Sequence, residues 1–147
     1  MHEPGEAQIL LAEDNPRDAE MTMRALRRIN FADRVQWVRD GEEALEFLLG
    51  QGRYVGRDVA SVPKLILLDL KMPRVDGVEV LRHIKASDAL KAIPVVIMTS
   101  SAEERDIVEA YDLGVNSYIV KPVQFQDFIE TVANVGLYWI LTNRAPS

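Results

Sequence analysis

Short apolar runs recur along the chain, separated by stretches with a different spacing. Mostly continuous runs occupy residues 8–12, 64–69, 93–98 and 117–120, while residues 34–38 alternate between apolar and polar positions. A continuous run of this length is typical of a strand covered on both faces, and alternation is typical of a strand with one solvated face. We therefore predict five strands.

The segments between these runs show the spacing of amphipathic helices, in which apolar residues return every three or four positions. Asn15 with Pro16 begins the first helix, and Asp40 and Ser101, each followed three positions later by glutamate, begin two more as capping boxes. We predict helices from residue 16, from residue 41, over 78–86, up to 113 and over about 125–141, and a loop over 51–62. The predicted core faces are Ala19, Met23, Leu26 and Ile29 in the first helix, Ala44, Leu45, Leu48 and Leu49 in the second, and Val80, Leu81 and Ile84 in the third.

Strand and helix thus alternate five times, which favours a parallel sheet with helices on both faces. Right-handed crossovers make a doubly wound arrangement the natural solution. We predict an α/β fold of the flavodoxin-like type, with five parallel strands in the order 2-1-3-4-5 and five helices. The length of 147 residues fits one domain over residues 1–147, with a core at about 8–142 and no output domain.

Composition excludes several kinds of chemistry. There is no cysteine, so disulfides, thiolate catalysis and cysteine-ligated metals are excluded. A net charge of −6 argues against a nucleic-acid surface, and no apolar run approaches the length of a membrane span. The short polar N-terminal segment lacks the pattern of a signal peptide. We expect a cytoplasmic protein with neither nucleic acid nor membrane as its partner.

Polar residues with metal- and phosphate-binding chemistry follow the predicted strands. Glu13 and Asp14 end the first strand, Asp69 the third, Thr99 the fourth and Lys121 the fifth. Ligands of such sheets bind beyond the carboxyl ends of the strands, so these groups are expected to meet at one edge. Three crowded carboxylates repel one another unless one is protonated or a divalent cation binds.

The donors at this edge are oxygens, which suit Mg²⁺ (or Mn²⁺) better than zinc. A phosphate beside the cation would find donors in Lys121, in the Thr99 hydroxyl and in the backbone N–H groups of Leu70 and Ser100. Asp69 could then act as a nucleophile and take up a phosphoryl group, because in-line transfer needs mainly positioning and charge neutralisation.

At four places in order, the chain resembles the receiver domains of two-component response regulators. These are the acidic pair and helix start at residues 13–16, the acceptor segment at 65–77, the hydroxyl-bearing strand at 93–100 and the lysine–proline segment at 118–122. The resemblance covers about residues 9–141. One departure is that the acidic pair begins with glutamate rather than aspartate, a common variation that is compatible with metal binding.

The resemblance implies a function and the roles of individual residues. Asp69 would accept a phosphoryl group from the phosphohistidine of a sensor histidine kinase. Asp14, Asp69 and the backbone carbonyl of Lys71 would bind Mg²⁺, and Glu13 would act on the metal mainly through water. The chain would be a phosphorylation-activated switch and not an enzyme, apart from its own phosphoryl uptake and slow autodephosphorylation.

The resemblance also implies how the signal leaves the site. Lys121 and Thr99 would contact the phosphoryl group, and Thr99 and Tyr118 would form a switch pair. The hydroxyl would move toward the phosphate while the aromatic ring turns inward. That motion would repack the face made by the fourth helix, the fifth strand and the fifth helix.

Several segments favour a subgroup of this family. The insert at 51–62, the run at 99–101, the stretch at 111–118 and the segment at 137–140 resemble small response regulators partnered with bacterial phytochromes. Similar segments could occur in receivers that serve other kinases, so that alternative stays open.

The last predicted helix carries more apolar residues than one stripe can bury. A wide buried face would explain its first half, but the surplus at Leu137, Tyr138, Trp139 and Ile140 favours a partner surface. A homodimer through the face of the fourth helix, fifth strand and fifth helix is the simplest form of it.

Ordinary structural roles and other functional classes remain as alternatives. Asp14 could belong only to a helix cap, Tyr118 could be a core aromatic, and Lys121 could be a loop lysine in front of a proline. A phosphohydrolase with an aspartyl phosphate would want an acid two positions after Asp69, where Lys71 stands. A carrier of FMN would need a glycine- and hydroxyl-rich loop after the first strand, where this chain is acidic.

Overall fold

The structure, a computed structural model, describes residues 8–29, 34–99 and 109–134. Its strands are β1 (Ile9–Ala12), β2 (Val35–Val38), β3 (Leu65–Asp69), β4 (Val95–Thr99) and β5 (Ser117–Val120). Its helices are α1 (Pro16–Arg28), α2 (Gly41–Leu49), the 3₁₀ helix η3 (Gly52–Tyr54), α3 (Gly77–Ala86) and α5 (Phe125–Asn134). All five predicted strands are confirmed.

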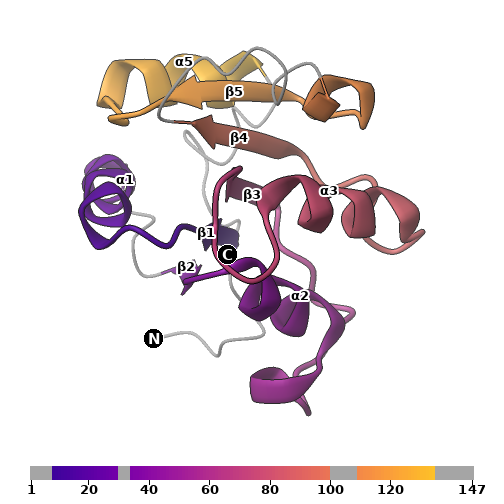
Figure 1. Cartoon of the computed structure of the whole chain (residues 1–147). Helices are drawn as coiled ribbons and strands as arrows, with labels where there is room; N and C mark the ends of the chain where they lie inside the picture. Colours follow the sequence, from indigo (N-terminus) through magenta and orange to yellow (C-terminus); the bar gives the residue numbers. More distant parts are fainter. Residues whose placement is uncertain (1–7, 30–33, 100–108, 135–147) are drawn as a thin grey trace, which may run out of the picture.

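The strands form one parallel sheet in the predicted order β2-β1-β3-β4-β5. Figure 1 shows them stacked in this order, with α1 on one side of the sheet and α2 and α3 on the other. Because every strand runs in the same direction, all carboxyl ends lie at one edge, which is where folds of this kind bind ligands.

Alternate residues of the strands pack into two separate cores. Leu10 and Leu68 belong to the core beneath α2 and α3, whereas Leu11 and Leu67 belong to the core beneath α1 and α5. None of the four is measurably exposed. Coverage on both faces explains why these strands appear in the sequence as continuous apolar runs.

Side-chain caps fix where the helices begin. The Asn15 side-chain oxygen accepts hydrogen bonds from two backbone N–H groups of the first turn of α1, including that of Asp18 at 3.1 Å. Asp40 accepts from the Glu43 N–H at 2.7 Å, as predicted. The Glu43 carboxylate reaches one residue further back than a capping box requires and accepts from the Arg39 N–H at 3.0 Å. The cap on Asn15 places the first turn of α1 directly after β1, at the carboxyl edge.

The buried face of α2 differs from the prediction. Phe47 is fully buried, whereas Leu49, which was predicted to face the core, is 41% exposed. The helix ends at Gly50, which adopts a left-handed conformation with φ of 66°. Leu49 is therefore the last helical residue, and the core contact is made earlier, at Phe47.

The predicted loop after α2 contains the 3₁₀ helix η3. Its last residue, Tyr54, meets the ring of Phe47 edge-on at a centroid distance of 5.1 Å, and its hydroxyl donates to the Glu43 carboxylate at 2.7 Å. Burial and the neighbouring carboxylate raise the pKa of the Tyr54 hydroxyl. This part of the insert is thus packed against α2.

Two predicted helices extend beyond the described residues. The helix predicted to reach residue 113 is described only at residues 109–112, which are helical, and α5 is described as far as Asn134. Within the part of the chain that the structure describes, no helix is long and apolar enough to cross a membrane.

Candidate functional site

Four strands deliver polar side chains to the carboxyl edge, as the sequence predicted. Glu13 and Asp14 follow β1, Asp69 is the last residue of β3, Thr99 is the last residue of β4 and Lys121 follows β5. The chain leaves each buried strand at this point, so a polar side chain can stand there without entering the core.

Lys121 lies at the centre of an ion-pair cluster. Its Nζ is 2.8 Å from Glu13 Oε1, 3.1 Å from Asp18 Oδ2 and 3.4 Å from Asp69 Oδ2. The lysine side chain is 7% exposed. Burial alone would lower the pKa of Lys121, but the hydrogen bond to Glu13 and the charges of Asp69 and Glu13 outweigh burial and raise that pKa. Lys121 is therefore held as an ammonium ion.

Asp69 is a buried carboxyl group whose ionisation is disfavoured. It is 4% exposed, and its Oδ1 accepts a hydrogen bond from the Lys71 N–H at 3.2 Å. Burial and the charge of Glu13 raise the pKa of Asp69 to about 7, although Lys121 and the Lys71 N–H act in the opposite direction. An additional cation beside Asp69 would favour its ionised form.

Glu13, Asp14 and Asp69 form a group that fits a divalent cation. One oxygen from each lies within 4.8 Å of the others. Glu13 is held in place, because its Oε2 accepts from the Asn15 N–H at 3.1 Å and its backbone carbonyl accepts from the indole N–H of Trp37 at 2.8 Å. Such an all-oxygen set suits a hard cation that keeps several water ligands.

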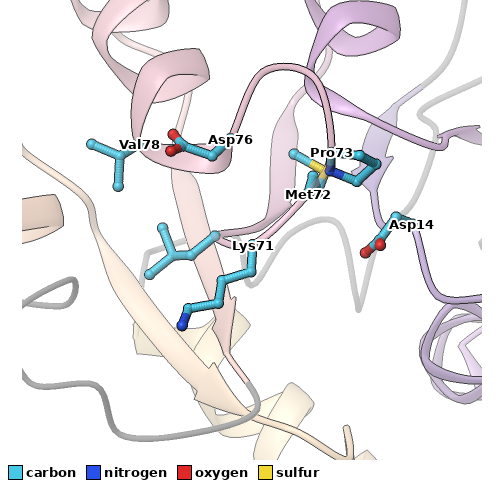
Figure 2. A pocket seen from close by; sticks show the side chains of 7 residues that line it. Asp14, Lys71, Met72, Pro73, Asp76 and Val78 are labelled. Carbon is cyan, nitrogen blue, oxygen red and sulfur yellow. The ribbon is translucent and has the colours of Figure 1, made fainter.

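A surface cleft of about 420 Å³ opens beside this acidic group. The cleft is lined by Asp14, Leu70, Lys71, Met72, Pro73, Asp76 and Val78. Figure 2 shows Asp14 and Asp76 on opposite sides of the cleft, with the loop that carries Lys71, Met72 and Pro73 between them. One carboxylate of the acidic group, Asp14, thus lines an open cleft at the carboxyl edge.

The loop that follows Asp69 is fixed against α2 by close backbone contacts. A side chain on Gly41 would place its Cβ 1.8 Å from the Val75 carbonyl oxygen, and one on Gly77 would place it 2.2 Å from the Asp69 carbonyl oxygen. Arg74, at φ of 68°, pairs with two acids at the start of α2 at 3.3 and 3.5 Å. The wall of the cleft is therefore held by packing that requires glycine.

One of the two predicted backbone donors, the Leu70 N–H, takes part in the sheet. The Leu70 N–H donates to the Met98 carbonyl at 3.3 Å, as part of the sheet, so it is already engaged. The Lys71 N–H, one residue further along, is the one directed at the Asp69 carboxylate. The other predicted donor, Ser100, lies outside the described residues.

The predicted switch residues lie on neighbouring strands, with Thr99 at the end of β4 and Tyr118 as the second residue of β5, beside Ile97. Thr99 is 5% exposed, and its carbonyl accepts from the Lys121 N–H at 2.7 Å. Tyr118 is 41% exposed, and its ring lies edge-on to Tyr111 at a centroid distance of 6.2 Å. Tyr118 is therefore not a core aromatic in this structure. The predicted partner surface at 137–140 lies outside the described residues.

Two residues that contact the cluster, Asp18 and Trp37, were not predicted from the sequence. Asp18 is the third residue of α1, and the first turn of a helix that directly follows a strand lies at the ligand edge, so its position was a usable signal. Trp37 contacts Glu13 because β2 pairs with β1, with Trp37 beside Leu11. The local sequence around Trp37 does not predict this contact.

Comparison with known proteins agrees with this geometry. The family model described as response regulator receiver domain matches residues 9–133. The probable methanogenesis regulatory protein FilR2 of Methanothrix harundinacea is 46% identical over 141 residues, covering 94% of this chain and 86% of FilR2. The response regulator Rcp1 of Synechocystis sp. is 37% identical over 139 residues, covering 95% of this chain and 92% of Rcp1.

Solved structures show the same similarity. The bacteriophytochrome response regulators RtBRR and AtBRR match with TM-scores of 0.83 and 0.81 at 47% and 50% identity, covering 94% and 92% of this chain and 82% and 96% of theirs. The Mn(2+)-bound form of Rcp1 has a TM-score of 0.75 at 37% identity, covering 95% of this chain and 98% of Rcp1. The phosphorylated cyanobacterial phytochrome response regulator RcpA has a TM-score of 0.74 at 38% identity, covering 96% of this chain and 97% of RcpA. The chain thus belongs to the response-regulator receiver family and is a phosphorylation-activated switch of two-component signalling.

Proposed function

We propose that Asp69 accepts the phosphoryl group of this switch from the phosphohistidine of a sensor histidine kinase. The observation that carries the proposal is the position of Asp69, which is buried beside the Lys121 ammonium and two further acids, next to an open cleft. A nucleophile in such a position needs little besides alignment and charge neutralisation to take up a phosphoryl group.

In the proposed transfer, a carboxylate oxygen of Asp69 attacks the phosphorus atom. An O–P bond forms, the N–P bond of the phosphohistidine breaks, and its electron pair stays on the histidine nitrogen. The reaction consumes no oxidant, reductant or other co-reactant. Asp69 reacts as a carboxylate, so every cation that favours its ionised form supports the step.

The proposed metal is Mg²⁺ or Mn²⁺, bound by the carboxylates of Asp14 and Asp69 and by the backbone carbonyl of Lys71. Glu13 would act on it mainly through water. The all-oxygen donor set supports this choice, as does the existence of an Mn(2+)-bound form of Rcp1. When bound, the cation would offset the charge of the acids and of the phosphoryl oxygens.

Lys121 and Thr99 are the proposed contacts of the phosphoryl oxygens. Lys121 Nζ is already 3.4 Å from Asp69 Oδ2, so a short movement would bring it to a phosphoryl oxygen. The Leu70 N–H stays a proposed backbone donor, and the neighbouring Lys71 N–H already donates to Asp69 Oδ1 at 3.2 Å. The Ser100 N–H remains a second proposed donor.

We propose that Thr99 and Tyr118 convert phosphorylation into a change of surface. Tyr118 is half-exposed in this structure, and its ring would turn inward when the Thr99 hydroxyl moves toward the phosphoryl group. The face formed by the helix before β5, by β5 and by α5 would then change shape. The proposed output is binding to another protein or removal of the phosphoryl group from a kinase. A homodimer through this face, with Leu137, Tyr138, Trp139 and Ile140, is a separate proposal.

The proposed kinase partner is a bacteriophytochrome. RtBRR and AtBRR, both bacteriophytochrome response regulators, support this choice. FilR2 has a comparable sequence identity of 46% but is a probable methanogenesis regulatory protein. Another sensor kinase is therefore the alternative. The net charge of −6 favours protein partners over nucleic acid. A cytoplasmic location is proposed because sensor kinases draw on cytoplasmic ATP.

Phosphoryl uptake from acetyl phosphate with Mg²⁺, followed by intact mass, tests the acceptor. We expect one added phosphoryl group, no addition in Asp69→Asn and reduced addition in Asp14→Asn. Asp88→Asn, whose side chain is 98% exposed, is the matched control and should behave as wild type. Undiminished uptake in Asp69→Asn would place the acceptor elsewhere.

Transfer from a kinase tests the partner. A purified, autophosphorylated bacteriophytochrome kinase should pass its phosphoryl group to this chain faster than an unrelated histidine kinase does. Equal rates from the two kinases would count against a bacteriophytochrome partner while leaving Asp69 as the acceptor.

A further inference from the structure

Asp18 is a carboxylate held at a fixed place beside Lys121. Its Oδ2 lies 3.1 Å from Lys121 Nζ, and its side chain is 22% exposed. The backbone of Asp18 is anchored on both sides, because its N–H donates to the Asn15 side chain at 3.1 Å and its carbonyl accepts from the Thr22 hydroxyl at 3.0 Å. Thr22 is fully buried, so this anchor belongs to the packed part of α1.

The contacts of Lys121 match the number of its donors. An ammonium carries three N–H groups, and three carboxylates surround it, with Glu13 at 2.8 Å, Asp18 at 3.1 Å and Asp69 at 3.4 Å. The longest of the three contacts is the one to Asp69. When Asp69 carries a phosphoryl group, that third N–H is the one free to turn to a phosphoryl oxygen, while Glu13 and Asp18 keep the other two.

We propose that Asp18 is a positioning residue for phosphoryl uptake, which it supports by holding the Lys121 ammonium, together with Glu13, in line with Asp69. This inference rests on the proposed function of Asp69 and Lys121 and adds a residue to it. Asp18 comes from α1, and it is not among the residues that line the cleft. It therefore acts through Lys121 and not on the phosphoryl donor.

A purely structural role for Asp18 makes a different prediction. An acid in the first turn of a helix is stabilised by the positive end of the helix dipole, and Asp18 is the acid in the first turn of α1. In that role its loss would lower stability but leave the rate of phosphoryl uptake by the folded protein unchanged. The two roles are separated by measuring both quantities on the same variants.

The test compares four forms of the full chain. Asp18→Asn removes the charge and keeps the shape, and Asp18→Glu keeps a carboxylate that can still reach Lys121. Glu20→Gln, on the exposed face of the same helix, is the matched control. Arg17→Glu with Asp18→Asn keeps an acid in the first turn but takes it away from Lys121, since Arg17 is exposed.

The readout is the rate of phosphoryl uptake from acetyl phosphate at saturating Mg²⁺, followed by intact mass over a range of acetyl phosphate concentrations. The O–P bond to Asp69 forms as the bond between phosphorus and the acetyl oxygen breaks, and acetate leaves with the electron pair. We expect Asp18→Asn to lower the maximal rate about 3- to 10-fold, because an orienting charge-assisted hydrogen bond is lost. The acetyl phosphate concentration at half-maximal rate should stay within about twofold, because Asp18 does not line the cleft.

The other forms decide between the roles. Glu20→Gln should match wild type, Asp18→Glu should recover most of the rate, and the double variant should be as slow as Asp18→Asn although its first turn keeps an acid. A wild-type rate in the double variant or in folded Asp18→Asn would overturn the positioning role. If Asp18→Asn does not fold, the double variant gives the decision. No uptake by wild type would instead refute the proposed function itself.

Discussion

Replacing Asp69 with asparagine removes a charge that the metal-free fold holds at a cost in free energy. The Asp69 carboxyl is 4% exposed and lies beside Glu13, and these two causes raise the pKa of Asp69 to about 7. The amide has nearly the same shape and can still accept a hydrogen bond from the Lys71 N–H. Lys121 keeps Glu13 and Asp18 as partners. We therefore predict that Asp69→Asn stabilises the protein in the absence of divalent cations.

The magnitude and the sign follow from the two pKa values of Asp69. In the unfolded chain the pKa is the ordinary 3.8, and in the folded protein it is about 7. The folded state binds the proton of Asp69 more tightly than the unfolded state does. The contribution of this proton to the free energy of unfolding is therefore complete below about pH 4 and declines as the pH rises to about 7. Each pH unit in that window corresponds to about 1.4 kcal/mol, so the upper limit of the loss is roughly 4 kcal/mol. Because Lys121 gives up one partner in the variant, we expect a measured gain of about 1–3 kcal/mol at pH 8.

The assay is urea unfolding of both proteins with EDTA at pH 8 and at pH 5, followed by circular dichroism. At pH 5, the increase in the free energy of unfolding caused by Asp69→Asn should be less than half of the increase at pH 8. Asp88→Asn, at a fully solvated side chain, should show no such pH dependence. Saturating Mg²⁺ should stabilise wild type more than Asp69→Asn, because the variant lacks one of the carboxylates proposed to bind the metal.

Two results would refute this reasoning. One is a metal-free Asp69→Asn protein that is less stable than wild type at pH 8. The other is a stability difference that stays the same from pH 5 to pH 8, since that would mean that the charge of Asp69 is not its source.

Three further substitutions test other parts of the structure. Trp37→Phe removes the indole N–H that donates to the Glu13 carbonyl, so it should lower the free energy of unfolding by about 0.5–1.5 kcal/mol and weaken Mg²⁺ binding in a calorimetric titration. Unchanged Mg²⁺ affinity would mean that Trp37 does not position Glu13. Phe47→Ala empties a fully buried site and should cost about 3–5 kcal/mol in urea unfolding; a cost under about 1 kcal/mol would contradict its place in the core. Gly41→Ala places a Cβ 1.8 Å from the Val75 carbonyl oxygen, so it should lower stability by about 1–3 kcal/mol and slow phosphoryl uptake. No effect on either quantity would show that the loop after Asp69 moves away freely.

The architecture was predictable because strands that are buried on both sides of a sheet appear in the sequence as continuous apolar runs. Runs such as 64–69 admit few polar residues, and caps such as Asn15 and Asp40 carry the chemistry that begins a helix. The choice between Phe47 and Leu49 as the core residue of α2 was not predictable, because both fit a helical stripe. The structure shows that Phe47 is fully buried, whereas Leu49, the last residue before Gly50, is 41% exposed.

The candidate site was predictable as far as strand ends reveal it. Glu13, Asp14, Asp69 and Lys121 all come directly at or after a strand, and parallel strands bring such residues together. The engagement of the Leu70 N–H was not predictable, because it depends on the register of β3 against β4. The contact between residues 18 and 121, which are 103 positions apart, depends on the assembled fold. The place of Asp18 in the first turn after β1 indicates only that it lies at the ligand edge.

The hydrogen bond between Trp37 and the Glu13 carbonyl gives the domain a built-in optical reporter. The indole fluoresces, and its emission responds to changes at the N–H that faces Glu13. The chain has two tryptophans, so Trp139→Phe leaves Trp37 as the sole tryptophan, which can be excited selectively over the tyrosines. Titration of that variant with a divalent cation or a phosphoryl donor can then be followed in real time without a label, because Trp37 is hydrogen-bonded to the backbone of Glu13.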